Sequence, residues 1–106
     1  MEREESGMDS RAESGIMVEE ELKEPAMYRV LLHNDDYTTM DFVVKILKDV
    51  FHKTQEESVS IMMSVHEKGM GVCGVYPKEL AEFRVKQVLS RAQMAGFPLL
   101  CTMEKE

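Results

Sequence analysis

The sequence predicts an α+β domain, a two-layer α/β sandwich with three helices on one face of a mostly antiparallel three-stranded sheet. Segments with the two-residue period of a strand and segments with helical spacing follow one another in the order β-α-α-β-α-β. Each connection between strands contains helix, and three strands with three helices are enough for two packed layers. A chain of 106 residues has room for one such domain with a modest core.

The first strand is predicted from Met27, because apolar residues at positions 28, 30 and 32 alternate along it. The turn-forming run Asn34-Asp35-Asp36 ends this strand. Thr38 is expected to cap the first helix in a capping box with Asp41, and the helical spacing of apolar residues continues to about Phe51.

Thr54-Gln55-Glu56-Glu57 repeats the helix-start signal, and Gly69 is the expected end of the second helix. The run from Gly71 to Tyr76 is rich in β-forming residues and predicts a strand. Pro77 suits the first turn of a third helix, which Gly96 ends. Residues 99–103 then predict the last strand.

Charge divides the chain into two parts, residues 1–24 and 25–106. Residues 1–24 carry nine acids and three bases, whereas residues 25–106 carry eleven acids and ten bases. The first part has no aromatic residue and too little apolar surface to offset its chain entropy, so we expect a disordered acidic extension. A segment that only improves solubility would have the same composition.

Several classes of function are disfavoured by composition. The sequence shows no basic stripe of the kind that nucleic-acid binding needs, and no apolar run approaches the length of a membrane span. Cys73 and Cys101 lie in apolar runs without CxxC spacing, and the N-terminus does not have the form of a signal peptide. We therefore expect a cytoplasmic protein with two reduced, buried thiols.

Polar side chains gather between the first strand and the first helix, from Asn34 to Thr38. A turn and a helix cap explain them without any function. A second interpretation follows if the second helix brings His66 back beside this turn. An amide, carboxylates and an imidazole would then surround one point, and such acceptors suit an ammonium group.

Metal binding and catalysis are the competing uses of these residues. His33, Asp35, Asp36 and His66 could supply metal ligands, but no pair has a recognised metal-site spacing. No nucleophile motif and no glycine-rich phosphate loop is present, so the sequence predicts neither an enzyme nor a cofactor. Methionine is abundant at ten residues, and Met40, Met62 and Met63 are expected to flank the polar turn. Flexible thioethers there would suit a pocket for several apolar shapes.

The ordered motifs Asn34–Val43, Val65-His66, Cys73-Gly74-Val75 and Pro98–Thr102 closely resemble ClpS, a bacterial adaptor family. The resemblance covers about residues 25–104. It implies an adaptor domain at 25–106 that binds the free first residue of N-degron substrates, namely Leu, Phe, Tyr or Trp. It also implies delivery of these substrates to the ClpA–ClpP unfoldase-protease.

The resemblance also assigns roles to residues. Asn34, Asp35 and His66 correspond to the groups that hydrogen-bond the substrate α-amino group. The implied pocket wall and rim consist of Asp36, Thr38, Met40, Val43, Met62, Val65 and Leu99. Met40 corresponds to the gatekeeper against β-branched first residues.

The implied partner is the N-terminal domain of a ClpA-type AAA+ unfoldase, contacted by Glu79 and by Arg84, where the family usually has Lys. The acidic extension corresponds to the segment that the unfoldase engages during delivery. We expect a monomer. A protein-interaction domain without terminus recognition is the alternative, since the C-terminal domain of a ribosomal stalk protein is a similar sandwich; a metal-dependent hydrolase is a third.

Overall fold

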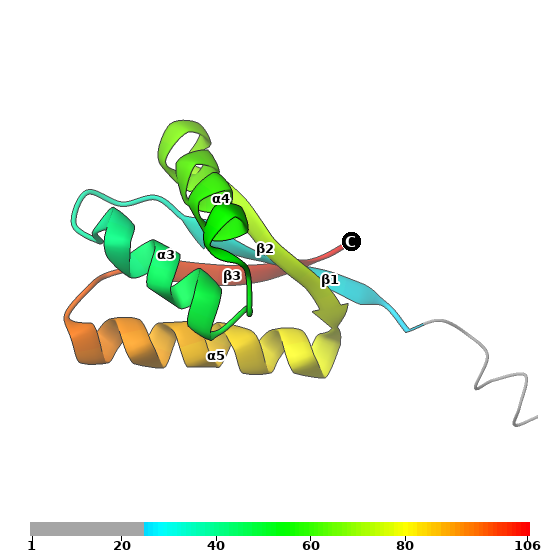
Figure 1. Cartoon of the computed structure of the whole chain (residues 1–106). Helices are drawn as coiled ribbons and strands as arrows, with labels where there is room; N and C mark the ends of the chain where they lie inside the picture. The colour runs from blue at the N-terminus through cyan, green and yellow to red at the C-terminus, as the bar shows by residue number, and fades with distance from the viewer. Residues whose placement is uncertain (1–24) are drawn as a thin grey trace, which may run out of the picture.

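The computed structural model describes residues 25–106, so the disorder expected for residues 1–24 lies outside the described residues. Three strands and three helices follow in the predicted order (Figure 1). They are β1 (Met27–His33), α3 (Met40–Asp49), α4 (Gln55–Lys68), β2 (Met70–Pro77), α5 (Lys78–Ala95) and β3 (Leu100–Lys105).

The three strands form one sheet in the order β2-β1-β3, with both neighbours of β1 antiparallel to it. The predicted fold class is therefore confirmed, and the sheet of the described residues is antiparallel throughout. The register of β2 shifts against β1 between Val30 and Leu31, next to Cys73. Such a bulge increases the local twist of the sheet.

The helices pack in front of one face of this sheet (Figure 1). Alternating strand residues, including Val30, Leu32 and Cys101, enter the core from this face and are almost inaccessible to water. The opposite face is partly polar. There Arg29 pairs with Glu104 at 3.2 Å.

The helix ends follow local chemistry, with one departure from the sequence prediction. Thr54 caps α4 in the predicted capping box with Glu57, and Gly69 ends that helix in the left-handed conformation at φ 92°. The predicted cap of the first helix is wrong by one residue. Thr39, not Thr38, accepts the hydrogen bond from the Phe42 N–H.

The described domain has two distinct ends (Figure 1). The connection from β1 to α3 and the first turn of α3 lie at one end. The start of β1 and the first turns of α5 lie at the other, because Met27 pairs with Pro77. None of the helices in residues 25–106 has the length and apolar character needed to cross a membrane.

Candidate functional site

The turn after β1 is organised by the Asp35 carboxylate. One of its oxygens accepts hydrogen bonds from the Tyr37 N–H at 2.8 Å and the Thr38 N–H at 2.7 Å. The other oxygen accepts from the Thr38 hydroxyl at 2.7 Å. Because the Thr38 hydroxyl is bound to Asp35, Thr39 caps α3 instead. Aspartate commonly forms turns in this way, by bonding backbone groups two or three residues later.

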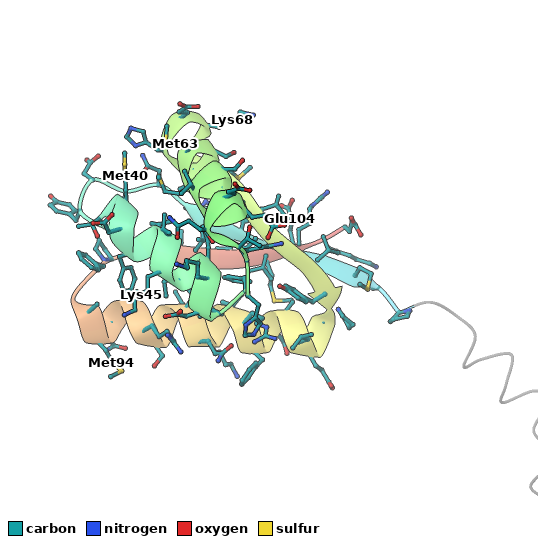
Figure 2. All side chains as sticks on the ribbon, viewed as in Figure 1. Met40, Lys45, Met63, Lys68, Met94 and Glu104 are labelled. Carbon is teal, nitrogen blue, oxygen red and sulfur yellow. The ribbon has the colours of Figure 1, made fainter. Side chains whose placement is uncertain are left out.

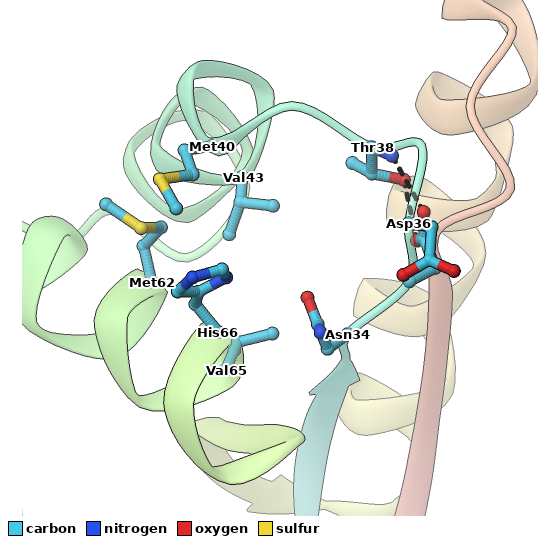
Figure 3. A pocket seen from close by; sticks show the side chains of 9 residues that line it. Asn34, Asp36, Thr38, Met40, Val43, Met62, Val65 and His66 are labelled. Carbon is cyan, nitrogen blue, oxygen red and sulfur yellow. Dashed lines mark hydrogen bonds between the residues drawn. The ribbon is translucent and has the colours of Figure 1, made fainter.

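Backbone pairing brings the turn to the end of α4. The Asn34 N–H donates to the Gly69 carbonyl at 2.9 Å, and His33 pairs with Met70 in the sheet. His66 lies in the last turn of α4, one turn before Gly69. As a result, the Asn34 amide and the His66 imidazole face each other across an open cavity (Figure 3).

This cavity has a volume of about 250 Å³ and lies between the turn, α3 and α4. Val43 and Val65 form an apolar floor and are 6% and 3% exposed. Met40 and Met62 lie together on one side, with Asp36 on the opposite side (Figure 3). The full lining is Asn34, Asp35, Asp36, Thr38, Met40, Val43, Met62, Val65 and His66.

The charges around the cavity favour a cation at its mouth. Asp35 and Asp36 are the charged residues in the lining, and both are acids. Burial raises the pKa of the Asp35 carboxyl, but the hydrogen bonds from Thr38 and Tyr37 outweigh this effect and leave that pKa below its ordinary value. Asp35 is therefore ionised at neutral pH. The C-terminal end of α4 adds the partial negative charge of its last carbonyls.

Comparisons with known proteins show the family of this chain. The sequence model of the family described as "ATP-dependent Clp protease adaptor protein ClpS" matches residues 23–102. The chain belongs to the ClpS family. It is thus an adaptor protein of the Clp protease rather than an enzyme.

Among its relatives, the ClpS of Oleidesulfovibrio alaskensis is 58% identical over 98 residues, which cover 92% of this chain and 94% of the relative. The ClpS of Lawsonia intracellularis is 54% identical over 90 residues, 85% of this chain and 83% of the relative. A solved structure of Agrobacterium tumefaciens ClpS2 bound to L-phenylalaninamide is similar with a TM-score of 0.76 and 38% identity. That similarity covers 78% of this chain and all of the other.

The ClpS-like cavity contains nine of the ten residues that the sequence analysis placed around the pocket, and every residue in its lining is one of them. Leu99 is the exception, and its place on the pocket wall stays a prediction. It is 4% exposed and belongs to the core cluster that also contains Val43 and Val65. Its side chain therefore supports the core that carries the floor. Met63 also lies outside the lining.

Glu79 and Arg84 lie on α5, away from the cavity. His33 is also outside the cavity lining, and its Nε2 is 2.7 Å from the Thr102 hydroxyl. Within residues 25–106, no group of three or more His, Cys, Asp or Glu side chains is arranged to hold a metal ion. Cys73 and Cys101 are free and buried, and burial raises the pKa of both thiols.

Proposed function

We propose that this ClpS-family adaptor binds the free N-terminal residue of N-degron substrates in the cavity and delivers them to a ClpA-type unfoldase. The observation that carries the proposal is the pairing of two surfaces in one cavity of about 250 Å³. Amide, carboxylate and imidazole acceptors occupy the mouth, and an apolar floor and two methionines lie beside them. A free N-terminus with a large apolar side chain presents the complementary groups.

Asn34 and His66 would accept hydrogen bonds from the α-ammonium group, with the imidazole in its neutral form. Asp35 would contribute charge. A carboxylate has about four lone-pair sites, and three are already used within the turn, so one remains available. The ammonium would thus be held by three acceptors from two elements that the Asn34–Gly69 backbone bond joins.

The first side chain would enter between the methionines and the valine floor. Burial of a Leu or Phe side chain contributes about 1.5–3 kcal/mol. Each charge-assisted hydrogen bond adds on the order of 1.5–3 kcal/mol. After the cost of ordering the peptide, this sum corresponds to roughly micromolar affinity. Neither part suffices alone, which explains why an internal leucine or an N-terminal glycine would be rejected.

Delivery would use the opposite end of the domain. We propose that Glu79 and Arg84 contact the N-terminal domain of the unfoldase, while residues 1–24 supply the segment that the unfoldase engages. The assignment rests on the family resemblance, and the position of the first turns of α5 at the opposite end of the domain supports it, because both partners could bind at once (Figure 1). The setting would be the cytoplasm, where the two buried thiols stay reduced.

Fluorescence anisotropy with peptides that differ only at the terminus tests recognition. A Leu-initiated peptide should bind, whereas its acetylated form and a Gly-initiated form should bind at least about tenfold more weakly, equivalent to a loss of 1.4 kcal/mol. Equal binding of the free and acetylated peptides would identify a general protein-interaction domain instead. Deletion of residues 1–18 should leave these affinities unchanged and slow degradation by the complete protease.

A further inference from the structure

Two large apolar side chains are exposed on the first half of α5, beside the residues proposed to contact the unfoldase. Phe83 is 53% exposed and Leu80 is 38% exposed. Residues three and four apart share a helix face, so Glu79 and Leu80 both neighbour Phe83. Aromatic side chains are enriched at the centres of protein interfaces, so an exposed phenylalanine beside the proposed contact residues is a candidate for a binding hot spot.

Exposure alone does not distinguish Phe83, because Leu89 and Met94 on the same helix are 39% and 85% exposed. Phe83 differs from these residues because the Arg84 side chain packs near its ring. The Arg84 guanidinium carbon lies 5.8 Å from the centre of the Phe83 ring and 6.0 Å from the centre of the Tyr76 ring. Both distances are within cation–π range.

This support continues into the core. The Tyr76 ring packs with the buried Phe51 ring at 6.4 Å between centroids. It also covers Gly74, where a Cβ would meet the Tyr76 ring at 2.8 Å. Arg84 is held further by a 3.1 Å hydrogen bond to Gln87. Phe83 therefore packs against an Arg84 side chain that is itself held in place. A side chain that is already ordered loses less conformational entropy when a partner binds.

The position of this surface suits a partner that must also reach residues 1–24. Met27 pairs with Pro77, the residue before α5, so the described chain begins next to the start of this helix. The substrate cavity is lined by the turn after β1 and by Met40 at the start of α3, and these segments lie at the opposite end of the domain (Figure 1). A protein seated on the first turns of α5 would leave the cavity open and lie next to the point where residues 1–24 connect to the domain.

We propose that Phe83, with Leu80 beside it, is the apolar anchor of this adaptor on the N-terminal domain of its unfoldase. The Phe83 ring enters an apolar cleft on the unfoldase, and a cation at the edge of that cleft pairs with Glu79. Arg84 mainly packs against the Phe83 ring and orients it. This inference rests on the proposed unfoldase contact, and it adds a residue that the resemblance does not supply.

The test is a titration of fluorescently labelled full-length adaptor with the unfoldase hexamer and a nonhydrolysable ATP analogue. Phe83→Ala should weaken binding by at least about tenfold, as expected for a hot-spot residue. Met94→Ala is the matched control, because Met94 is a more exposed apolar residue near the far end of the same helix (Figure 2). Binding of a Leu-initiated peptide should be unchanged in both variants.

The outcomes separate this inference from the proposed function. If Glu79→Ala and Arg84→Ala weaken unfoldase binding while Phe83→Ala does not, the anchor is refuted and the contact surface stands. If all three variants bind as the parent does, the proposed contact itself fails. Equal losses for Phe83→Ala and Met94→Ala, or a loss of peptide binding with Phe83→Ala, would also overturn the inference. Arg84→Lys should bind the unfoldase more weakly than the parent does, because a compact ammonium replaces the planar guanidinium that lies within cation–π range of both rings.

Discussion

Replacement of Asp35 separates the two roles that the site gives this residue, turn formation and charge. Asp35→Ala removes the acceptor of three hydrogen bonds, two from backbone N–H groups and one from the Thr38 hydroxyl. Asp35→Asn keeps a carbonyl oxygen for the backbone groups, and its amide can donate to the hydroxyl. The asparagine variant therefore loses the charge and retains the turn.

The expected magnitudes follow from this count. The side chain is half-buried, so water replaces part of each bond, and roughly 1 kcal/mol apiece is a suitable value. Three bonds then stabilise the binding-competent conformation of the turn by about 3 kcal/mol. If the variant must first form that conformation to bind, its peptide affinity falls by about 100-fold. Loss of charge alone should cost about tenfold or less, a single hydrogen-bond contribution near 1.4 kcal/mol.

The assay is anisotropy with one Leu-initiated peptide and the parent, Asp35→Ala, Asp35→Asn and Thr38→Val proteins. Thr38→Val removes only the hydroxyl bond to Asp35 and should cost about fivefold, equivalent to roughly 1 kcal/mol. If the alanine and asparagine variants lose the same affinity, charge on the ammonium dominates and the turn-forming role is refuted.

Three further predictions concern the cavity and the core. Met40→Ala should raise the affinity for Ile-initiated relative to Leu-initiated peptides, because Met40 lines the cavity and its truncation leaves room for a β-branched side chain. An unchanged affinity ratio would refute the role of Met40 as gatekeeper. His66→Ala should weaken binding of a Leu-initiated peptide by about tenfold, because it removes one hydrogen-bond acceptor for the ammonium group. Unchanged affinity in His66→Ala would contradict the role of His66. The lowered pKa of Asp35 means that the stabilisation of its turn is fully present above the ordinary value of 3.8 and is lost only as the pH falls below it. Finally, burial raises the pKa of Cys101 to about 12 and that of Cys73 well above its usual range. Neither thiol should therefore react with a disulfide reagent at pH 8 until the protein unfolds. Rapid labelling of the native protein would show instead that these thiols are accessible.

The fold was largely predictable because each element carries a local signal. Thr54 with Glu57 and the left-handed Gly69 mark both ends of α4, and the alternation after Met27 marks β1. The order of the strands in the sheet was not predictable in this way. Periodicity does not show that β1 lies between β2 and β3, because pairing depends on how the helices cross over the sheet.

The candidate site shows the same division. Its lining could be named in advance because one turn and one helix supply most of it, and the motifs in those segments resemble a known family. Thr38 and Thr39 are equally good caps in sequence, and only the Asp35 hydrogen bonds decide between them. The place of Leu99 on the pocket wall stays a prediction, because Leu99 is as buried as Val43 and Val65 and its sequence neighbours do not reveal whether it also reaches the cavity. Phe83 was not singled out, since its support by Arg84 and Tyr76 depends on tertiary contacts.

The central claim is that one cavity recognises both the free terminus and the first side chain. An NMR titration of the isotopically labelled full-length chain with L-leucinamide tests it most directly, with N-acetyl-L-leucinamide as control. We expect the largest shift changes at Asn34, Met62 and His66 with the free amine, and little change with the acetylated form. Changes centred instead on the apolar groove between α3 and α5, around Phe42 and Met94, or equal changes with both ligands, would contradict the claim.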